Sequence, residues 1–433
     1  MRTHQQTHLL RNRLSPVIRF SVLAVVCFLL ILILIIPGFT AQPVKVTLLM
    51  QALEAAQWEP LVQEFNEKHP DIELEIIEGP NATNQVEDLY TSSFLLGNSP
   101  YDLVFMDIVW VPKFAAAGWL RSLSDRVSKT DLTAFLDGDV NGGRYQDELY
   151  RMPVRSDGGM LYYRTDLLQE GGYQPPKTFA QLLDISQTLQ QKKLAEWGYV
   201  WQGKQYEGLP AMFVEVLAGY GAFWVNPDTL EVGLDSLQAI EAVKFLRSTL
   251  ETQVSPPGIT TYAEEEARRL FQNGDAVFMR NWPYAFGLLS EPDSPVRGKF
   301  AIQPMVHAPN QSSGACLGGW GLGITTSSKH PDAAWEVVKF FSSEETQRKF
   351  VLATGYVPSR RALFNDPEIL GKYPHYSDLL EVVESAALRP PIAQYAQASD
   401  ILQRYLSAAI TNQMTPEQAM EKAANETRRL LGK

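Results

Sequence analysis

The spacing of apolar residues predicts alternating strands and helices in the first third of the chain. Residues 44–50 are mostly β-branched or apolar, as in a strand. Residues 58–65 carry apolar side chains at i, i+3, i+4 and i+7, the stripe of an amphipathic helix. Residues 72–77 largely alternate between apolar and acidic, and residues 102–106 are a short apolar run typical of a strand buried on both faces. The chain is therefore expected to open strand–helix–strand–helix–strand, the alternation of a parallel sheet with right-handed crossovers.

Helical patterning dominates further along the chain. Apolar stripes at residues 237–250 and 335–341 predict two helices, and the sequence after Pro374 consists mostly of helix-forming residues. Segments rich in Pro and Gly at residues 255–258 and 309–314 are expected to be loops. No internal repeat of the length found in solenoid proteins is visible.

The N-terminal segment is expected to direct export. Every residue from Val22 to Ile36 is apolar, and the wider stretch 17–36 follows a basic start. This pattern is typical of a signal peptide or a signal-anchor helix. Its length lies between that of a signal peptide and a full membrane span, so cleavage and retention as a membrane anchor both stay open.

Length and composition predict a two-domain globular protein. The 433 residues are 45% hydrophobic and 20% charged, and two domains are the usual solution at this length. The net charge is −11 although the first 41 residues contain four arginines and no acidic residue, so the remainder is distinctly acidic. An acidic body repels phosphate, which argues against nucleic-acid binding. The only cysteines are Cys27 and Cys316, which excludes a disulfide scaffold.

Carboxylate, arginine and aromatic residues gather near five expected strand ends, where open α/β sheets bind ligands. They are Gln51, Glu54, Asp107, Trp110, Arg155, Asp157, Trp282, Tyr284, Gly319 and Trp320. Carboxylates accept hydrogen bonds from sugar hydroxyls, and aromatic faces cover the C–H face of a pyranose. Each position alone also fits core packing or a helix cap. Their joint occurrence favours a neutral sugar site.

Signals for catalysis, metals and cofactors are weak. The six histidines lack metal-ligand spacing, and neither a nucleophile elbow nor a dinucleotide-binding loop is present. Asp107 and Asp157 could serve as the acid/base pair of a glycosidase, which the sequence alone does not decide. Glu264–Glu266, followed by two arginines, is interpreted as a solvated helix face. No catalytic residue, metal site or cofactor is therefore predicted.

Three sequence blocks resemble a known family. Residues 200–209, 280–285 and 317–320 are similar to blocks of the extracytoplasmic solute-binding proteins of sugar ABC transporters, in particular the trehalose/maltose-binding subgroup. The resemblance implies a two-lobed α/β fold, each lobe a mainly parallel sheet flanked by helices, that closes over a sugar. After a signal or anchor (1–41), we expect an N-lobe of residues 43–152 plus 316–345 and a C-lobe of residues 153–315 plus 346–433.

The resemblance also implies particular ligand-binding residues. It places Asp107 and Asp157 on facing lobes. The full set of matched positions is Glu54, Asp107, Asp157, Trp282, Tyr284, Gly319, Trp320 and Arg389. Arg155 joins this set as a departure, since the family often has an aromatic residue there, and the arginine expected near Gln85 is missing. The ligand therefore stays open among trehalose, maltose, sucrose and a glucosyl-polyol such as glucosylglycerol.

The predicted function is capture of an α-glucoside for an ABC importer. The partners would be the sugar and the membrane permease subunits, and the protein is expected to be a non-enzymatic monomer at the periplasmic or extracytoplasmic face of the membrane. A glycosidase and a sugar-sensing receptor component are the alternatives. Arg155 is expected to set ligand choice, unless it merely pairs with Asp157.

Overall fold

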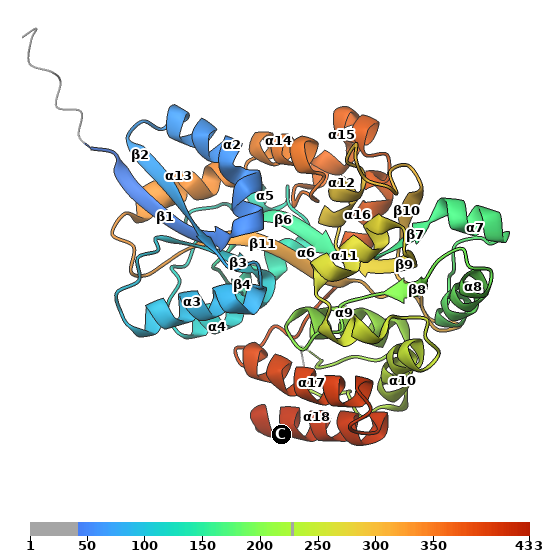
Figure 1. Ribbon diagram of the computed structural model, residues 1–433. Coiled ribbons are helices and arrows are strands. Elements are labelled where there is room, and N and C mark those ends of the chain that lie inside the picture. Colours follow the sequence, from blue (N-terminus) through green and yellow to red (C-terminus); the bar gives the residue numbers. More distant parts are fainter. Residues whose placement is uncertain (1–41, 227–228) are drawn as a thin grey trace, which may run out of the picture. The chain divides into compact units, whose positions relative to one another are not determined.

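The computed structural model describes residues 42–226 and 229–433, so the predicted export segment lies outside the described residues (Figure 1). Residues Lys45–Lys433 form one compact unit. Within the described part of the chain, no helix has both the length and the apolar character needed to cross a membrane.

The first third of the described chain has the predicted alternation. Its elements are β1 (Val44–Gln51), α2 (Ala52–Lys68), β2 (Ile72–Gly79), α3 (Thr83–Leu95), β3 (Leu103–Asp107), η1 (Ile108–Trp110), α4 (Val111–Ala116), α5 (Lys129–Leu132), α6 (Asp137–Asn141), β4 (Arg144–Tyr145) and β5 (Glu148–Leu149). All five residues of β3 are buried, as expected for a strand covered on both faces. The strand–helix–strand–helix–strand opening is therefore confirmed.

The middle of the chain builds a second sheet and its helices. Its elements are β6 (Met152–Gly158), β7 (Met160–Arg164), α7 (Thr165–Gly171), α8 (Phe179–Gln191), β8 (Trp197–Val200), α9 (Gly208–Gly219), α10 (Leu237–Glu251), η2 (Pro257–Thr261), α11 (Glu264–Asn273), β9 (Ala276–Asn281), α12 (Tyr284–Leu289) and β10 (Phe300–Gln303). The helix expected from the stripe at residues 237–250 is α10. Of that stripe Val243 and Leu246 are buried, Ile240 and Leu250 are half-buried and Leu237 is exposed.

The last part is mostly helical, as predicted. Its elements are β11 (Cys316–Ile324), α13 (Pro331–Phe341), α14 (Glu344–Thr354), η3 (Arg361–Asn365), α15 (Pro367–Lys372), α16 (Tyr376–Ser385), β12 (Ala387–Leu388), α17 (Tyr395–Ile410) and α18 (Pro416–Leu430). The final pair, α17 and α18, packs together and against α10.

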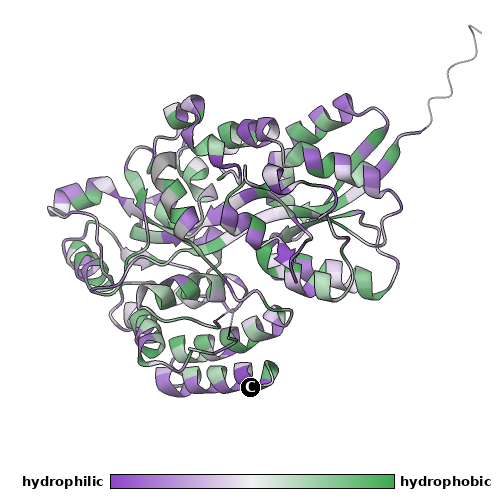
Figure 2. Ribbon diagram, turned by 180° about the vertical axis from the view of Figure 1, so that it is seen from behind, coloured by the Kyte–Doolittle hydropathy of each residue, from purple (hydrophilic) through white to green (hydrophobic). Residues whose placement is uncertain are grey.

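Each of two sheets, with its helices, forms one lobe, which confirms the two-lobed α/β fold. The first sheet has the order β12-β11-β3-β1-β2, with β6 beside β11. The second has the order β10-β7-β9-β8. Figure 2 shows many helices banded with polar and apolar residues, as expected for helices that bury one face, whereas α9 is buried almost throughout.

The expectation of mainly parallel sheets was wrong in detail. In the first sheet β11 runs antiparallel to β3 and β6, and in the second β7 runs antiparallel to β9 and β10. Parallel neighbours need a long return connection, usually a helix, between consecutive strands. Here β7 enters the second sheet directly from β6 instead, with only Gly159 between them.

Gly159 marks this crossing between the sheets. A β-carbon at Gly159 would lie 1.5 Å from Glu215 Oε1 and 2.4 Å from Arg280 Nη2, so no side chain fits. Arg280 and Glu215 are fully buried and form an ion pair. The backbone at the crossing is thus packed directly against a buried charge pair.

Candidate functional site

A cavity of about 610 Å³ collects side chains from the ends of several strands and helices. We call it the main cavity. All nine predicted ligand-binding residues line it: Glu54, Asp107, Arg155, Asp157, Trp282, Tyr284, Gly319, Trp320 and Arg389. The volume falls within the range of about 300–1,000 Å³ usual for small-molecule sites.

Strand register brings Asp107, Arg155, Asp157 and Trp320 together. Trp320 of β11 pairs with Asp107 of β3 on one side and with Arg155 of β6 on the other, and Gly318 pairs with Asp157. Arg155 and Asp157 are two residues apart in an extended strand, which places both on one face. The expectation that Asp107 and Asp157 lie on facing lobes was wrong, because both strands pair with β11 in one sheet.

Arg155 holds the first charge cluster, which comprises Glu54, Arg155 and Asp157. Its Nε and Nη2 donate to Glu54 Oε1 and Oε2 at 3.0 and 3.1 Å, and its Nη1 donates to Asp157. Glu54 also accepts from Trp58 Nε1 at 3.0 Å. All three members of the cluster are less than one-tenth exposed. Three of the five guanidinium N–H groups are used, which leaves two.

Arg389 holds the second charge cluster, with Asp107 and Glu207. Its Nη2 donates to Asp107 Oδ1 and its Nη1 to Glu207 Oε1, both at 2.7 Å. Ser399 and Tyr395 also donate to Glu207. Asp107 in addition caps η1 by accepting from the backbone N–H of Val109, so the cap and the cavity roles coexist.

The aromatic walls are held by neighbouring side chains. Trp282 has the guanidinium of Arg280 4.0 Å from its ring centroid, and its Nε1 donates to Glu264 at 3.3 Å. Trp320 stacks on Phe105, with 5.1 Å between the ring centroids. These contacts fix the orientation of both indole rings.

Trp110, one of the strand-end candidates, does not line the main cavity. It is 1% exposed and packs edge-on against Trp320 at 5.4 Å. The structure therefore places Trp110 in the core, which is the alternative role for a tryptophan after a strand.

The acidic run at the start of α11 is not a purely solvated face, which corrects that interpretation. All three glutamates line the main cavity, and Glu264 and Glu265 are half-buried. Glu264 binds Trp282 and Tyr206, and Glu265 accepts from the Tyr284 hydroxyl at 2.8 Å. The first turn of a helix favours negative charge, so the run is stable where it supports the aromatic wall. Glu266 is exposed, as expected.

Gly319 lines the main cavity through its backbone. Its φ of 124° is in the region that favours glycine, and an added β-carbon would lie 3.1 Å from Arg155 O and 3.2 Å from Asp139 Oδ1. Asp139 and Arg151 lie beside Gly319. Burial raises the pKa of Asp139 to about 7 and lowers the pKa of Arg151 to about 10.

Sequence reasoning missed several lining residues. Glu207 is the most important of them, because it completes the second charge cluster. Others are Asn81, Gln85, Lys204, Gln205, Tyr206 and Tyr356. Glu207 follows Tyr206 within residues 200–209, one of the three blocks that resemble the family. Its position in that block was the sequence feature that could have identified it.

Burial perturbs the carboxylates of both clusters. Burial, reinforced by neighbouring carboxylates, raises the pKa of Asp157 to about 6 despite the ion pair with Arg155. Burial also raises the pKa of Glu207. Within residues 42–226 and 229–433, no group of His, Cys, Asp and Glu side chains could hold a metal ion.

Three buried polar atoms on the main cavity have no protein partner. They are Asp157 Oδ1 and Gln51 Oε1, which are acceptors, and Arg389 Nε, which is a donor. Buried polar groups in folded proteins are nearly always paired, so these atoms point to a bound polar molecule or water.

Comparison with known proteins gives a consistent picture. Residues 51–348 match the family model of the bacterial extracellular solute-binding protein. The maltose-bound MalE3 of T. maritima superposes with a TM-score of 0.86 and 36% identity, covering 89% of this chain and all of that one. A probable ABC transporter-binding protein of Deinococcus radiodurans is 29% identical, covering 83% of this chain and 87% of that protein. A maltotriose-binding protein of Pyrococcus abyssi is 25% identical, covering 74% and 67% of the two chains.

Proposed function

The chain belongs to the family of bacterial extracellular solute-binding proteins, and from that premise we propose that it captures an α-glucoside for an ABC importer. The ligand would be trehalose, maltose, sucrose or a glucosyl-polyol such as glucosylglycerol, bound in the main cavity. The protein would act outside the cytoplasm as a monomer and deliver the sugar to the membrane permease. The maltose and maltotriose ligands of the relatives support this class.

The observation that carries the proposal is the set of unpartnered polar atoms on residues that line the main cavity together with two tryptophans. A sugar hydroxyl both donates and accepts, so hydroxyls can satisfy Asp157 Oδ1, Gln51 Oε1 and Arg389 Nε together. Trp282 and Trp320 offer rigid apolar area for the C–H faces of the rings. Few other neutral molecules combine both properties.

The charge of the lining favours a neutral ligand. Each arginine of the two clusters is paired with two carboxylates, so each cluster keeps one surplus negative charge when its carboxylates are ionised. Glu264 and Glu265 add negative charge near Trp282. A phosphorylated or acidic sugar would be repelled by this surplus of carboxylates.

Arg155 is the proposed determinant of ligand choice. It lines the main cavity, and its two unused N–H groups suit ring oxygens and hydroxyl lone pairs better than an apolar ring face. An arginine at this point favours a polyol or fructosyl unit beside the glucose. Its bond to Asp157 is compatible with this role, since the same guanidinium serves both.

Closure of the lobes would complete binding. Only a closed form can contact the sugar from both sheets, so ligand shifts the open–closed equilibrium toward closure. We propose the expected lobe boundaries for this motion, except that β6 and β12, which pair with β11 in the first sheet, would move with the N-lobe. The crossing at Gly159 would then be one of the chain passages between the lobes.

A thermal-shift screen tests the function. The four candidate sugars should include one that raises the unfolding temperature, because a ligand at a hundredfold excess over Kd stabilises the folded state by about 2.7 kcal/mol. Glucose and galactose serve as controls for monosaccharide binding. No shift with any α-glucoside would contradict the proposal, and release of free glucose from a bound sugar would identify a glycosidase instead.

A further inference from the structure

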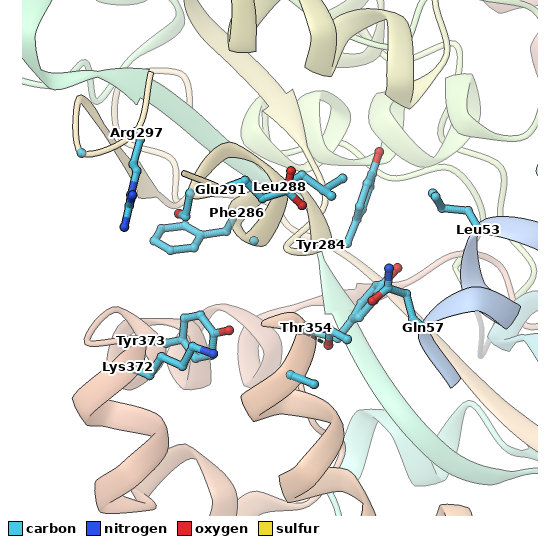
Figure 3. Close-up of a pocket in the computed structure, with 15 residues that line it drawn as sticks. Leu53, Gln57, Tyr284, Phe286, Leu288, Glu291, Arg297, Thr354, Lys372 and Tyr373 are labelled. Carbon is cyan, nitrogen blue, oxygen red and sulfur yellow. Dashed lines mark hydrogen bonds between the residues drawn. The ribbon is translucent and has the colours of Figure 1, made fainter. Parts of the chain in front are cut away.

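The tryptophan of α2 is buried beside the main cavity without lining it. α2 contributes Leu53 and Glu54 to the main cavity, and Leu53 and Gln57 to a second cavity of about 560 Å³ (Figure 3). Trp58 lines neither of the two and is 1% exposed. A ligand in either cavity does not touch its indole, so any effect of Trp58 on binding has to pass through its neighbours.

A hydrogen bond links Trp58 to the first charge cluster. Trp58 Nε1 donates to Glu54 Oε1 at 3.0 Å, one helical turn away on α2. The same oxygen accepts from Arg155 Nε at 3.0 Å, and Glu54 Oε2 accepts from Arg155 Nη2 at 3.1 Å. Because two donors from different elements hold Oε1, the carboxylate cannot turn without losing one of these charge-assisted bonds.

A stack of aromatic rings provides a second link. The ring of Trp58 lies nearly parallel to that of Phe350 in α14, with 3.9 Å between the centroids and 16° between the planes. Phe350 stacks in turn on Tyr356, with a centroid distance of 5.2 Å and an angle of 8°. The guanidinium of Arg155 lies 4.8 Å from the ring centroid of Tyr356. The stack that begins at Trp58 therefore ends at this arginine.

A third link reaches another aromatic neighbour of Arg155. Trp58 packs edge-on against Phe105 of β3, with 6.4 Å between the centroids, and Phe105 stacks on Trp320. The guanidinium of Arg155 lies 5.7 Å from the ring centroid of Trp320. Trp58 is thus connected to Arg155 through a carboxylate and along two aromatic paths.

We infer that Trp58 is a positioning residue that holds Glu54 and Arg155 in the orientation that receives the ligand. The inference rests on the proposed function of the main cavity and adds to it a residue that the ligand never touches. Arg155 has two N–H groups left for the ligand, and their direction depends on where the guanidinium is anchored. A binding site needs its groups held to within about 0.5 Å, which is the task of the buried residues behind it.

The test has to separate positioning from support of the core, because Trp58 also packs edge-on against Phe341 at 5.0 Å. Trp58→Phe removes the N–H donor and keeps an aromatic ring. Phe65→Leu is the matched control, since Phe65 is fully buried on the same helix but contacts His69 and Phe340 rather than the first charge cluster. Urea unfolding of both variants gives the loss of stability against which their other effects are compared.

Two measurements are made on the parent protein and on both variants. Calorimetry gives the affinities for trehalose, maltose, sucrose and glucosylglycerol. NMR of protein with isotope-labelled arginine gives the hydrogen-exchange rate of Arg155 Nε–H, whose signal is identified by its absence in Arg155→Met. Trp58→Phe should weaken each sugar complex that the parent forms, and speed the exchange, by about fivefold or more. Phe65→Leu should change either quantity by less than about twofold.

Three results would overturn the inference. The first is an unchanged affinity and exchange rate in Trp58→Phe, and the second is an equal effect in both variants, which would indicate general support of the core. The third is a change in affinity without a change in exchange, or the reverse, because the proposed effect passes through Arg155.

Two further provisions keep the test decisive. If Trp58→Phe does not fold, Phe350→Leu is measured instead, because it removes the ring between Trp58 and Tyr356. If the parent binds none of the four sugars, the proposed function fails, and the exchange rates alone decide whether Trp58 positions Arg155.

Discussion

Replacement of Arg155 by methionine should destabilise the protein, because it removes the cation of the first charge cluster. Methionine keeps much of the apolar stem that packs near Tyr356 and Trp320 but removes three charge-assisted hydrogen bonds. Glu54 and Asp157 would then be buried carboxylates without a cation. Breaking a buried ion pair by removing one partner costs about 3–5 kcal/mol, which is the expected loss in the free energy of unfolding at pH 7.

The pH dependence of this loss follows from proton uptake. In the variant, a carboxyl group of the pair has a raised pKa in the folded state, so the folded protein binds one proton more than the unfolded chain above about pH 4. Stability of the variant therefore rises as the pH falls. In the parent, Asp157 has a pKa of about 6, so it is mostly ionised at pH 8 and 7 and half-protonated at pH 6. The deficit should therefore shrink by up to about 1.4 kcal/mol from pH 8 to 7 and by less from pH 7 to 6.

Urea unfolding at pH 8, 7 and 6, followed by tryptophan fluorescence, measures the deficit. Arg155→Met combined with Asp157→Asn should recover a large part of the loss, because one unpaired charge is removed. A deficit below about 1 kcal/mol that does not change with pH would refute the reasoning, since the carboxylates would then be hydrated rather than buried.

Four further outcomes are expected. Trp282→Ala should weaken sugar binding by about 1–3 kcal/mol in calorimetry with an intact melting transition, and unchanged affinity would remove it from the site. Arg155→Tyr should change the affinity ranking of trehalose, maltose, sucrose and glucosylglycerol, whereas a uniform drop would make Arg155 structural support. Because burial raises the pKa of Asp157 to about 6, the affinity for the sugar should fall as the pH drops from 7 to 5. Asp157→Asn should remove most of this pH dependence, and a parent affinity that does not change with pH would argue against Asp157 as an acceptor. Gly319→Ala should lower stability by about 1–3 kcal/mol in urea unfolding, because φ is 124°; a smaller loss would mean that the backbone relaxes there.

The local pattern of the sequence predicts the elements well but not how distant strands pair. Apolar periodicity identifies β1, α2 and β3, because burial of one stripe or of a whole strand is a local property. The position of β11 between β3 and β6 depends on the return of the chain long after both strands, from Gly158 at the end of β6 to Cys316 at the start of β11. No local sequence pattern predicts this antiparallel pairing.

The same distinction applies to the candidate site. Residue type and position at a strand end were sufficient to propose Asp107 and Asp157 as lining residues. The partner of Arg389, Glu207, is 182 residues away in sequence, so their ion pair could not be read from spacing. The run Glu264–Glu266 has the composition of any exposed helix start, and only the packing of α11 beside Trp282 shows that it lines the main cavity.

The register of β11 has a consequence for how this protein can diverge. Trp320 is aligned with Asp107 and with Arg155 at once, so a single inserted or deleted residue in β11 ahead of Trp320 would turn its neighbours to the opposite face of the sheet. Substitutions carry no such penalty, because each changes one side chain and leaves the alignment intact. Lineages of this chain should therefore acquire new ligands by exchanging residues such as Arg155, while changes of length accumulate in the surface loops.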